Sequence, residues 1–199
     1  MNMNKQVPPR IVVGITGASG VVYGIRMLQL LRELGVETHL VMSKSAQVTL
    51  AHESDLSVAQ LRAMADVTYA NSDIGAAISS GSFKVTGMVV APCSIKTLSE
   101  IATGVTSNLL SRAADVNLKE RRRLVLMVRE TPLHLGHLRS MAAVTEAGAV
   151  VFPPVPAFYS RPASIEEMVD HTVGRCLDLF GFDSGVVKRW DPKGTDNPA

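Results

Sequence analysis

The sequence contains few cysteines. Of its 199 residues only two are cysteine, Cys93 and Cys176, and they lie far apart. Neither belongs to a C-x-x-C pair, so the sequence predicts neither a disulfide framework nor a cysteine-based zinc site. We expect a protein of a reducing compartment, the cytoplasm. Cys93 follows an apolar run, where a cysteine more often acts as a small hydrophobic side chain than as a nucleophile.

An excess of charge is also missing. The chain has 20 Lys and Arg against 18 Asp and Glu, which gives a net charge of +2. A protein that binds nucleic acid usually needs a much stronger positive footprint, so we expect no nucleic acid partner. No apolar run reaches the length of a membrane span without charge, and residues 1–10 lack the apolar core of a signal peptide. We therefore expect no membrane partner.

Apolar segments of two kinds alternate along the chain. Short runs rich in β-branched residues predict strands at residues 11–15, 36–42, 67–69, 88–91, 124–128 and 149–152. Apolar residues at helical spacing predict helices at residues 21–34, 44–52, 58–65, 109–118, 133–147 and 165–180, one after Ser94, and a helical turn at 74–78. This alternation is typical of an α/β fold with a three-layer, doubly wound parallel sheet.

The expected organisation is a single domain. A length of 199 residues and a hydrophobic content of 46% suit one core. We expect a flexible N-terminus at residues 1–10, the domain at 11–183 and a C-terminal tail at 184–199. Pro153–Pro162 is too rich in proline for a helix and predicts an extended arm across the surface.

Polar residues follow four of the expected strands: Thr16–Gly20, Ser43, Cys93–Thr97 and Arg129–Glu130. In a doubly wound sheet, ligands bind beyond the carboxyl ends of the strands, so these segments should converge. The turn Gly17-Ala18-Ser19-Gly20 offers backbone N–H groups at a helix N-terminus, which suits a phosphate or a flavin edge. Glycine is also common in tight turns for their shape alone.

A nicotinamide dinucleotide site predicts an acidic residue at the end of the second strand, where it would hold a ribose. This chain has Met42-Ser43-Lys44 there instead. Residue types alone thus indicate a phosphate-bearing ligand without naming a reaction.

Two further polar clusters have simple structural explanations. His134 and His137 lie three residues apart near Glu130, but two histidines without more ligands rarely form a metal site. The basic run Lys119–Arg123 could bind phosphate, although charges at a helix end are usually a solvated face. We expect no metal.

Six segments form a more specific pattern, in one order and spacing: Gly14–Gly20, Pro92–Leu98, Arg112–Asp115, Leu118–Arg122, Val128–Pro132 and Pro154–Tyr159. Together they resemble the UbiX-type flavin prenyltransferases, including the small partner proteins of phenolic acid decarboxylases. The resemblance runs from about Ile11 to Trp190.

The resemblance implies a Rossmann-like or flavodoxin-like subunit that binds FMN and dimethylallyl phosphate. Such enzymes transfer the dimethylallyl group to N5 and C6 of reduced FMN without a metal. The product, prenylated FMN, serves a UbiD-type decarboxylase. The implied assembly is a dodecamer with active sites at subunit contacts.

The resemblance also implies roles for single residues. The implied FMN contacts are Gly17, Ala18, Ser19, Ser43, Ser94, Ile95, Lys96, Thr97 and Arg129. The implied ligands of the substrate phosphate are Tyr159, Arg175, Lys119 and Arg112. The implied catalytic residues are Glu130 as acid or base at the phosphate, Glu53 in proton transfer near the flavin, and Lys119 at the leaving group.

Three other functions remain open to the sequence. A flavin-dependent cysteine decarboxylase shares the fold but carries a Pro-x-Met-Asn segment, where this chain has Pro153-Pro154-Val155-Pro156. A non-catalytic flavin carrier that serves a decarboxylase would need no Lys119, Glu130, Tyr159 and Arg175 together. Direct decarboxylation of an aromatic acid needs an aromatic-acid pocket, for which the sequence gives no signal.

Overall fold

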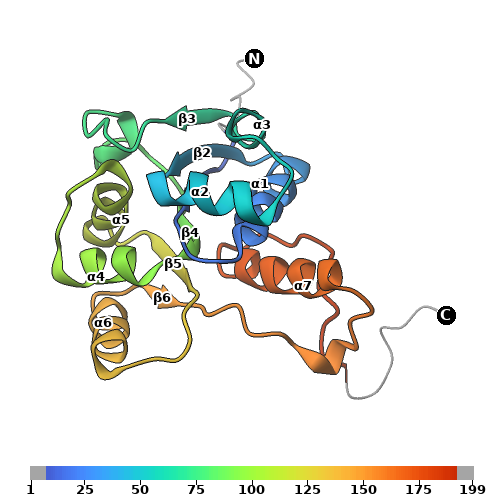
Figure 1. Cartoon of the computed structure of the whole chain (residues 1–199). Coiled ribbons are helices and arrows are strands. Elements are labelled where there is room, and N and C mark those ends of the chain that lie inside the picture. Colours follow the sequence, from blue (N-terminus) through green and yellow to red (C-terminus); the bar gives the residue numbers. More distant parts are fainter. Residues whose placement is uncertain (1–7, 192–199) are drawn as a thin grey trace, which may run out of the picture.

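Six parallel strands form one sheet in the order β3-β2-β1-β4-β5-β6 in the computed structural model, which describes residues 8–191 (Figure 1). The strands are β1 (Arg10–Ile15), β2 (Glu37–Met42), β3 (Val67–Tyr69), β4 (Gly87–Cys93), β5 (Arg123–Val128) and β6 (Val150–Val151). β1 and β4, at the centre, are buried along almost their whole length. Such continuous burial matches a parallel strand that is covered on both faces.

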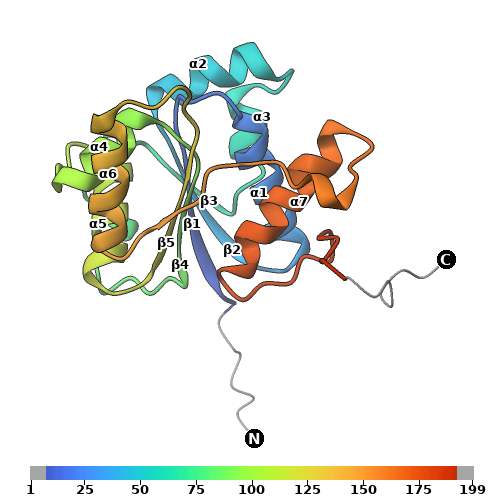
Figure 2. The ribbon, with the colours of Figure 1, turned by 90° about the horizontal axis from the view of Figure 1, so that it is seen from below.

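Helices cover both faces of the sheet (Figure 2). They are α1 (Val21–Glu33), α2 (Lys44–Glu53), α3 (Val58–Arg62), α4 (Ile95–Thr103), α5 (Leu109–Lys119), α6 (Leu135–Glu146) and α7 (Ile165–Asp178). Strands β1, β2, β4 and β5 contribute alternate residues to two hydrophobic clusters, one on each face of the sheet. One cluster packs these strands against α1, α2, α3 and α7, and the other packs them against α4, α5 and α6. The predicted three-layer, doubly wound fold is therefore confirmed.

Two predicted segments differ in detail. The helical turn expected at residues 74–78 is a short 3-10 turn at Ala77–Ser79. The arm expected to lack helix contains a 3-10 turn at Phe158–Ser160, because that stretch is free of proline between Pro156 and Pro162. The arm otherwise crosses the surface as an extended chain between β6 and α7 (Figure 1).

The carboxyl ends of β1 and β4 meet at the point where the strand order reverses. The chain runs outward from β1 to β2 on one side and from β4 to β5 on the other. Thr16 joins the two strand ends, because its hydroxyl donates to the Pro92 carbonyl at 2.7 Å and accepts from the Ser94 amide at 2.8 Å. Ligands of open α/β sheets bind at such a switch point.

Residues 184–191, the described part of the expected tail, pack against α7. A Cβ atom at Gly174 would lie 2.5 Å from Val187 Cγ2 and 2.9 Å from Ser184 Oγ. Only a glycine in α7 allows this close approach. The rest of the expected tail and most of the expected N-terminal segment lie outside the described residues. None of the helices within residues 8–191 is long and apolar enough to cross a membrane.

Candidate active site

A cavity of about 440 Å³ opens at the carboxyl ends of β1, β2 and β4. It contains five predicted flavin contacts, Gly17, Ser43, Ser94, Lys96 and Thr97. The other lining residues were not predicted from the sequence: Lys44, Ser45, Asn71, Glu100, Ser107, Asn108 and Leu110. Most of the lining is polar, with hydroxyl, amide and ammonium donors.

Three helices point their N-termini at this cavity. Ser43 caps α2, Ser94 caps α4 and Asn108 caps α5, each by accepting from a backbone N–H of the first turn. Helix N-termini carry partial positive charge, which favours an anion such as a phosphate. The one acidic side chain in the lining, Glu100, is already engaged by Lys96 and by Asn108.

A larger cavity, of about 590 Å³, lies at the opposite edge of the sheet. It is lined by the consecutive arginines 121–123 and by residues at the C-terminal ends of α5, α6 and α7. Helix C-termini carry partial negative charge, and nearby arginines offset it. Volume alone would favour this cavity, but the helix ends disfavour an anion here, so we assign the ligand site to the smaller one.

Glu53, a predicted proton-transfer residue, holds the start of α1. Its Oε2 atom accepts from the backbone N–H of Gly20 at 2.8 Å and of Val21 at 2.9 Å. Partial burial disfavours the carboxylate, but hydrogen bonds from the Ser19 hydroxyl and these two amides outweigh it and lower the pKa of Glu53. Glu53 is thus an anionic cap of α1 that also orients Ser19.

A Glu53→Gln substitution should therefore destabilise the fold in a pH-dependent way. The pKa of Glu53 is depressed in the folded state, so its contribution is present above the usual value of 4.5 and is lost as the pH falls through the folded value. We expect a loss of about 0.5–1 kcal/mol at pH 7 that shrinks below pH 4.5, measured by urea unfolding. Glu146→Gln, at an exposed position, is the matched control. An equal loss at both pH values would contradict the capping role.

Arg129, a predicted flavin contact, follows β5 directly and is exposed. Its backbone N–H donates to the Cys93 carbonyl at 3.1 Å, which ties the end of β5 to the end of β4. Burial raises the pKa of Tyr23, and the positive charge of Arg129 opposes this shift. Arg129 also lowers the pKa of Glu53. The guanidinium therefore lies near the start of α1, next to the predicted flavin turn.

The remaining predicted flavin contacts lie beside the cavity. Ala18 and Ser19 belong to the turn between β1 and α1, next to Gly17. Ile95 is the first residue of α4 and packs partly against the core.

Glu130, a predicted catalytic residue, is exposed after β5, and its Oε1 accepts from the backbone N–H of Thr131 at 3.0 Å.

Cys93 is inert in this structure. Its side chain is fully buried at the end of β4, and burial raises the pKa of the thiol. A thiol with a raised pKa is a poor nucleophile at neutral pH. The prediction that Cys93 acts as a small hydrophobic side chain is confirmed.

The rings of His134 and His137 lie against each other at the start of α6, with centroids 3.6 Å apart and planes tilted by 34°. His134 caps this helix by accepting from the Gly136 N–H. Within residues 8–191, no group of three or more His, Cys, Asp or Glu side chains could hold a metal ion.

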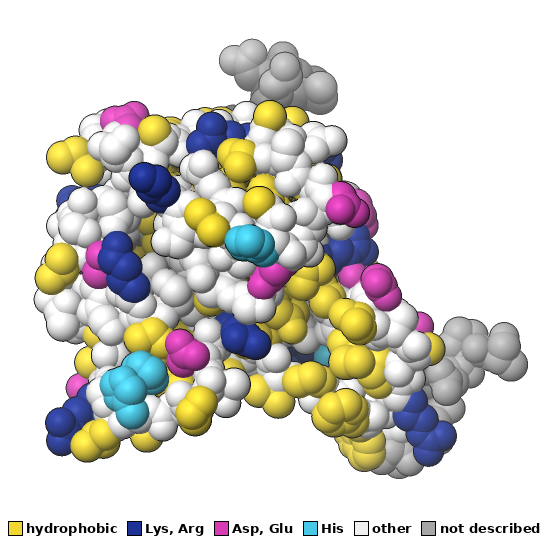
Figure 3. All heavy atoms as spheres, in the orientation of Figure 1, with side chains coloured by type: hydrophobic (Ala, Val, Ile, Leu, Met, Phe, Trp, Pro, Cys, Tyr) yellow, Lys and Arg dark blue, Asp and Glu magenta, His cyan; other side chains and the backbone are white. Residues whose placement is uncertain are grey.

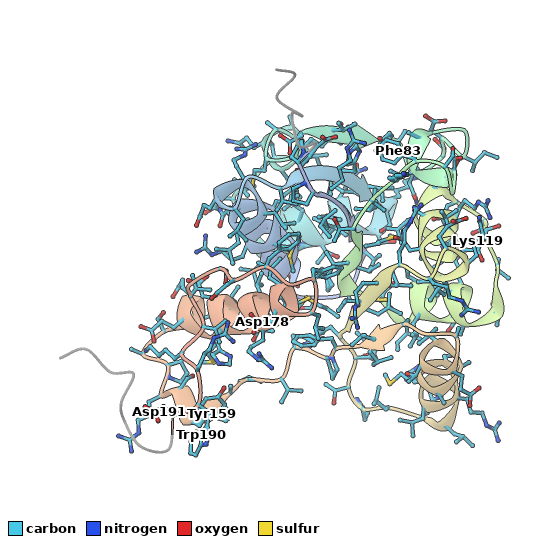
Figure 4. All side chains as sticks on the ribbon, turned by 180° about the vertical axis from the view of Figure 1, so that it is seen from behind. Phe83, Lys119, Tyr159, Asp178, Trp190 and Asp191 are labelled. Carbon is cyan, nitrogen blue, oxygen red and sulfur yellow. The ribbon has the colours of Figure 1, made fainter. Side chains whose placement is uncertain are left out.

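Tyr159 lies in an aromatic cluster at the end of the arm. Its ring meets His171 of α7 and Trp190 edge to face, with centroids 5.7 Å and 5.5 Å away. Figure 4 shows Tyr159 and Trp190 together at the far end of the arm. Trp190 and His171 were not predicted at this site, since nothing in their local sequence indicates that they meet Tyr159.

Arg175, a predicted phosphate ligand, takes part in a network of charges on α7. Its guanidinium lies 2.5 Å from Asp178 Oδ2. Arg189 also binds Asp178, through both carboxylate oxygens at 3.0 Å. Hydrogen bonds from Arg189, only partly opposed by burial, and from Arg175 lower the pKa of Asp178. Two arginines thus share the carboxylate of Asp178, and Arg189 also lies 3.4 Å from Asp183, so the network balances its charges.

Lys119 and Tyr159, two predicted ligands of the substrate phosphate, lie far apart within one chain. Lys119 ends α5, next to the strand start at Arg123, whereas Tyr159 lies on the arm that follows β6. Figure 4 shows the two residues on opposite sides of the molecule. Arg112, two turns earlier in α5, binds the Ser79 carbonyl and Asp115. The sequence could not predict this separation, because it depends on where α5 and the arm lie around the sheet.

Comparison with known proteins identifies the family of this chain. The chain matches the flavoprotein family over residues 2–177. It is 60% identical to flavin prenyltransferase UbiX of Escherichia coli K12, over 91% of this chain and 97% of that protein. Flavin prenyltransferase UbiX of Thauera aromatica is 56% identical over 91% and 93%.

Solved structures give the same result. A UbiX protein in complex with FMN and dimethylallyl pyrophosphate superposes with a TM-score of 0.92 at 55% identity, covering 93% of this chain and 98% of that one. A dodecameric FMN-dependent UbiX-like decarboxylase from Escherichia coli O157:H7 gives a TM-score of 0.90 at 47% identity, covering 92% and 99%. The peptidyl-cysteine decarboxylase EpiD shares only the fold, at 15% identity and a TM-score of 0.61. The chain therefore belongs to the UbiX family of flavin prenyltransferases.

Proposed function

We propose that this chain transfers the dimethylallyl group of dimethylallyl phosphate to N5 and C6 of reduced FMN. The observation that supports this most directly is the cavity at the carboxyl ends of β1, β2 and β4, where three helix N-termini and a row of hydroxyls meet. Such a cavity fits the phosphate and polyol chain of FMN, and a relative with 55% identity was solved with FMN.

The residues that hold FMN in this proposal are Gly17, Ala18, Ser19, Ser43, Ser94, Ile95, Lys96, Thr97 and Arg129. When bound in its reduced form, FMN supplies the nucleophilic N5 and the C6 carbon. Thr16 fixes the two flavin-binding turns relative to each other, and Glu53 fixes Ser19. These contacts position the flavin before any chemistry takes place.

Breaking the allylic C–O bond leaves negative charge on the phosphate. Tyr159 and Arg175 of one chain bind that phosphate in this proposal, and Glu130 exchanges a proton with it. The shared carboxylate of Asp178 lets Arg175 turn to the phosphate, since Arg189 still neutralises Asp178. Lys119 and Arg112 reach the same phosphate from a neighbouring protomer, because Lys119 and Tyr159 lie on opposite sides of one chain.

An exposed hydrophobic surface supports such an assembly. The space-filling view shows hydrophobic side chains gathered over the arm and α7, facing a hollow (Figure 3). Among the exposed ones are Val155 at 70%, Phe158 at 73% and Trp190 at 69%. Monomeric proteins rarely expose a continuous surface of this kind. We propose a dodecamer, the assembly of the UbiX-like relative with 47% identity.

The product would act elsewhere. Prenylated FMN is a cofactor, and in this proposal a UbiD-type decarboxylase receives it.

Both cysteines are free and buried, which suits a reducing compartment such as the cytoplasm.

The test is anaerobic incubation of the purified protein with reduced FMN and dimethylallyl phosphate, followed by the mass and spectrum of the flavin. We expect a flavin heavier by one C5H8 unit. Glu130→Gln and Tyr159→Phe should each slow its formation by roughly 100-fold, as expected when one acid–base or anion-binding group is lost. Dimethylallyl pyrophosphate, tested in parallel, shows which phosphate ester is used. Unmodified flavin at full occupancy with both esters would favour the non-catalytic carrier.

A further inference from the structure

Helix α7 carries a buried histidine that has no part in the roles assigned so far. His171 is 7% exposed, and the Nε2 atom of its ring lies 3.2 Å from the hydroxyl oxygen of Tyr159. The ring planes are inclined by 82°. Because a buried ring nitrogen needs a hydrogen-bond partner, this contact fixes the imidazole and the phenol relative to each other.

Tyr159 receives little support from the core. It belongs to the 3-10 turn Phe158–Ser160 in the arm and is 48% exposed. In the part of the chain that the structure describes, its ring contacts His171 and Trp190. The direction of the phenol proton therefore depends on the hydrogen bond with His171.

A phenol has one proton to donate. If Tyr159 donates it to His171, it has none left for the substrate phosphate. We infer that His171 is a positioning residue for Tyr159: its Nε2–H donates to the phenol oxygen, so that the phenol proton points to the phosphate. This inference rests on the proposed function, since it assumes that Tyr159 binds the phosphate of the substrate.

The surroundings of His171 favour this tautomer. The ring also lines a polar cavity of about 130 Å³, together with Glu167, Asp170 and Lys188. Both carboxylates already have cationic partners, Asp170 with Arg26 at 2.5 Å and Glu167 with Lys188 at 3.2 Å. Neither needs a proton from the imidazole. The second ring nitrogen can then accept from solvent in the cavity while Nε2 carries the proton.

The helix geometry places this pair next to the predicted phosphate ligand of α7. His171 and Arg175 are four residues apart, so they lie on neighbouring turns of one face. A phenol oriented by His171 and the guanidinium of Arg175 can thus act on the same phosphate. His171 itself need not touch the substrate.

The test uses His171→Phe, which keeps the ring volume, and His171→Gln, which keeps an N–H near the place of Nε2. We expect His171→Phe to lower kcat for flavin prenylation about tenfold, the effect of one lost hydrogen bond. FMN affinity should stay unchanged, and His171→Gln should recover most of the rate. In a Tyr159→Phe background, His171→Phe should cause no further loss. His137→Phe on α6 is the matched control. If His171→Phe does not fold, His171→Asn replaces it, because its shorter amide cannot reach Tyr159.

Several outcomes would overturn the inference. If His171→Phe prenylates FMN at the wild-type rate, the inference fails but the proposed function stands. The same holds if adding His171→Phe to Tyr159→Phe lowers the rate by a further tenfold. If the wild type does not prenylate FMN, the proposed function fails. The role of His171 is then tested by the binding of dimethylallyl phosphate. The single tryptophan, Trp190, touches Tyr159, so its fluorescence reports titration with dimethylallyl phosphate. In that case we expect His171→Phe to bind dimethylallyl phosphate more weakly than the wild type, and equal affinity would rule out the positioning role.

Discussion

Co-expression of a Lys119→Ala chain with a Tyr159→Phe chain is expected to restore activity that neither variant has alone. Each substitution removes one group that stabilises the leaving phosphate and should slow prenylation by roughly 100-fold. Lys119 and Tyr159 lie on opposite sides of one chain, so a complete site needs Lys119 from one protomer and Tyr159 from its neighbour. In a randomly mixed oligomer, about a quarter of the contacts combine two intact groups, which predicts about a quarter of the wild-type rate.

The control is a mixture of Lys119→Ala and Arg112→Ala chains. Both residues belong to α5 and lie two turns apart on one face, so they should enter the same neighbouring site together. No contact in this mixture has both groups intact, and activity should stay low. Differently tagged chains, purified over both tags, confirm that the oligomers are mixed. If the first mixture stays as inactive as its parents, Lys119 does not act on the phosphate that Tyr159 binds.

Local sequence patterns carry most of the fold. The strand β1 and helix α1 were predictable because a β-branched run, a glycine turn and a helical run follow one another at residues 11–34. Parallel strands end at one edge of the sheet, so Gly17, Ser43 and Ser94 could be placed together without coordinates. The structure confirms that these three residues line one cavity.

Contacts between distant segments were not predictable. Asn71 lines the cavity from the loop after β3, and its side chain binds the Leu110 N–H, 39 residues later. The meeting of Tyr159 with His171 depends on how the arm folds back onto α7. Asn108, in contrast, could have been predicted at the site from the sequence. It directly precedes a helical run, as an N-cap residue does, and helix N-termini line this site.

A single added methyl group at Gly17 should weaken flavin binding strongly. A Cβ atom at this position would lie 2.3 Å from the Ser45 Cβ, far inside normal contact distance. Gly17 and Ser45 both line the proposed flavin cavity, so the turn or the start of α2 must move and the donors move with it. We expect Gly17→Ala to weaken FMN binding by 10- to 100-fold, which corresponds to about 1.4–2.8 kcal/mol, measured by equilibrium titration.

A second substitution separates this steric effect from general damage to the fold. Ser45→Gly removes the Cβ atom with which the new methyl group of Gly17→Ala would clash. The nearest atoms to that methyl group are then the backbone C and Cα of residue 45, at 3.1 Å and 3.3 Å. The double variant should therefore regain part of the affinity, whereas Ser45→Gly alone should weaken it slightly. Gly75→Ala is the matched control, since its Cβ would find nothing closer than 3.6 Å. If Gly17→Ala binds FMN as the wild type does, the flavin does not depend on this turn, and the cavity assignment fails with it.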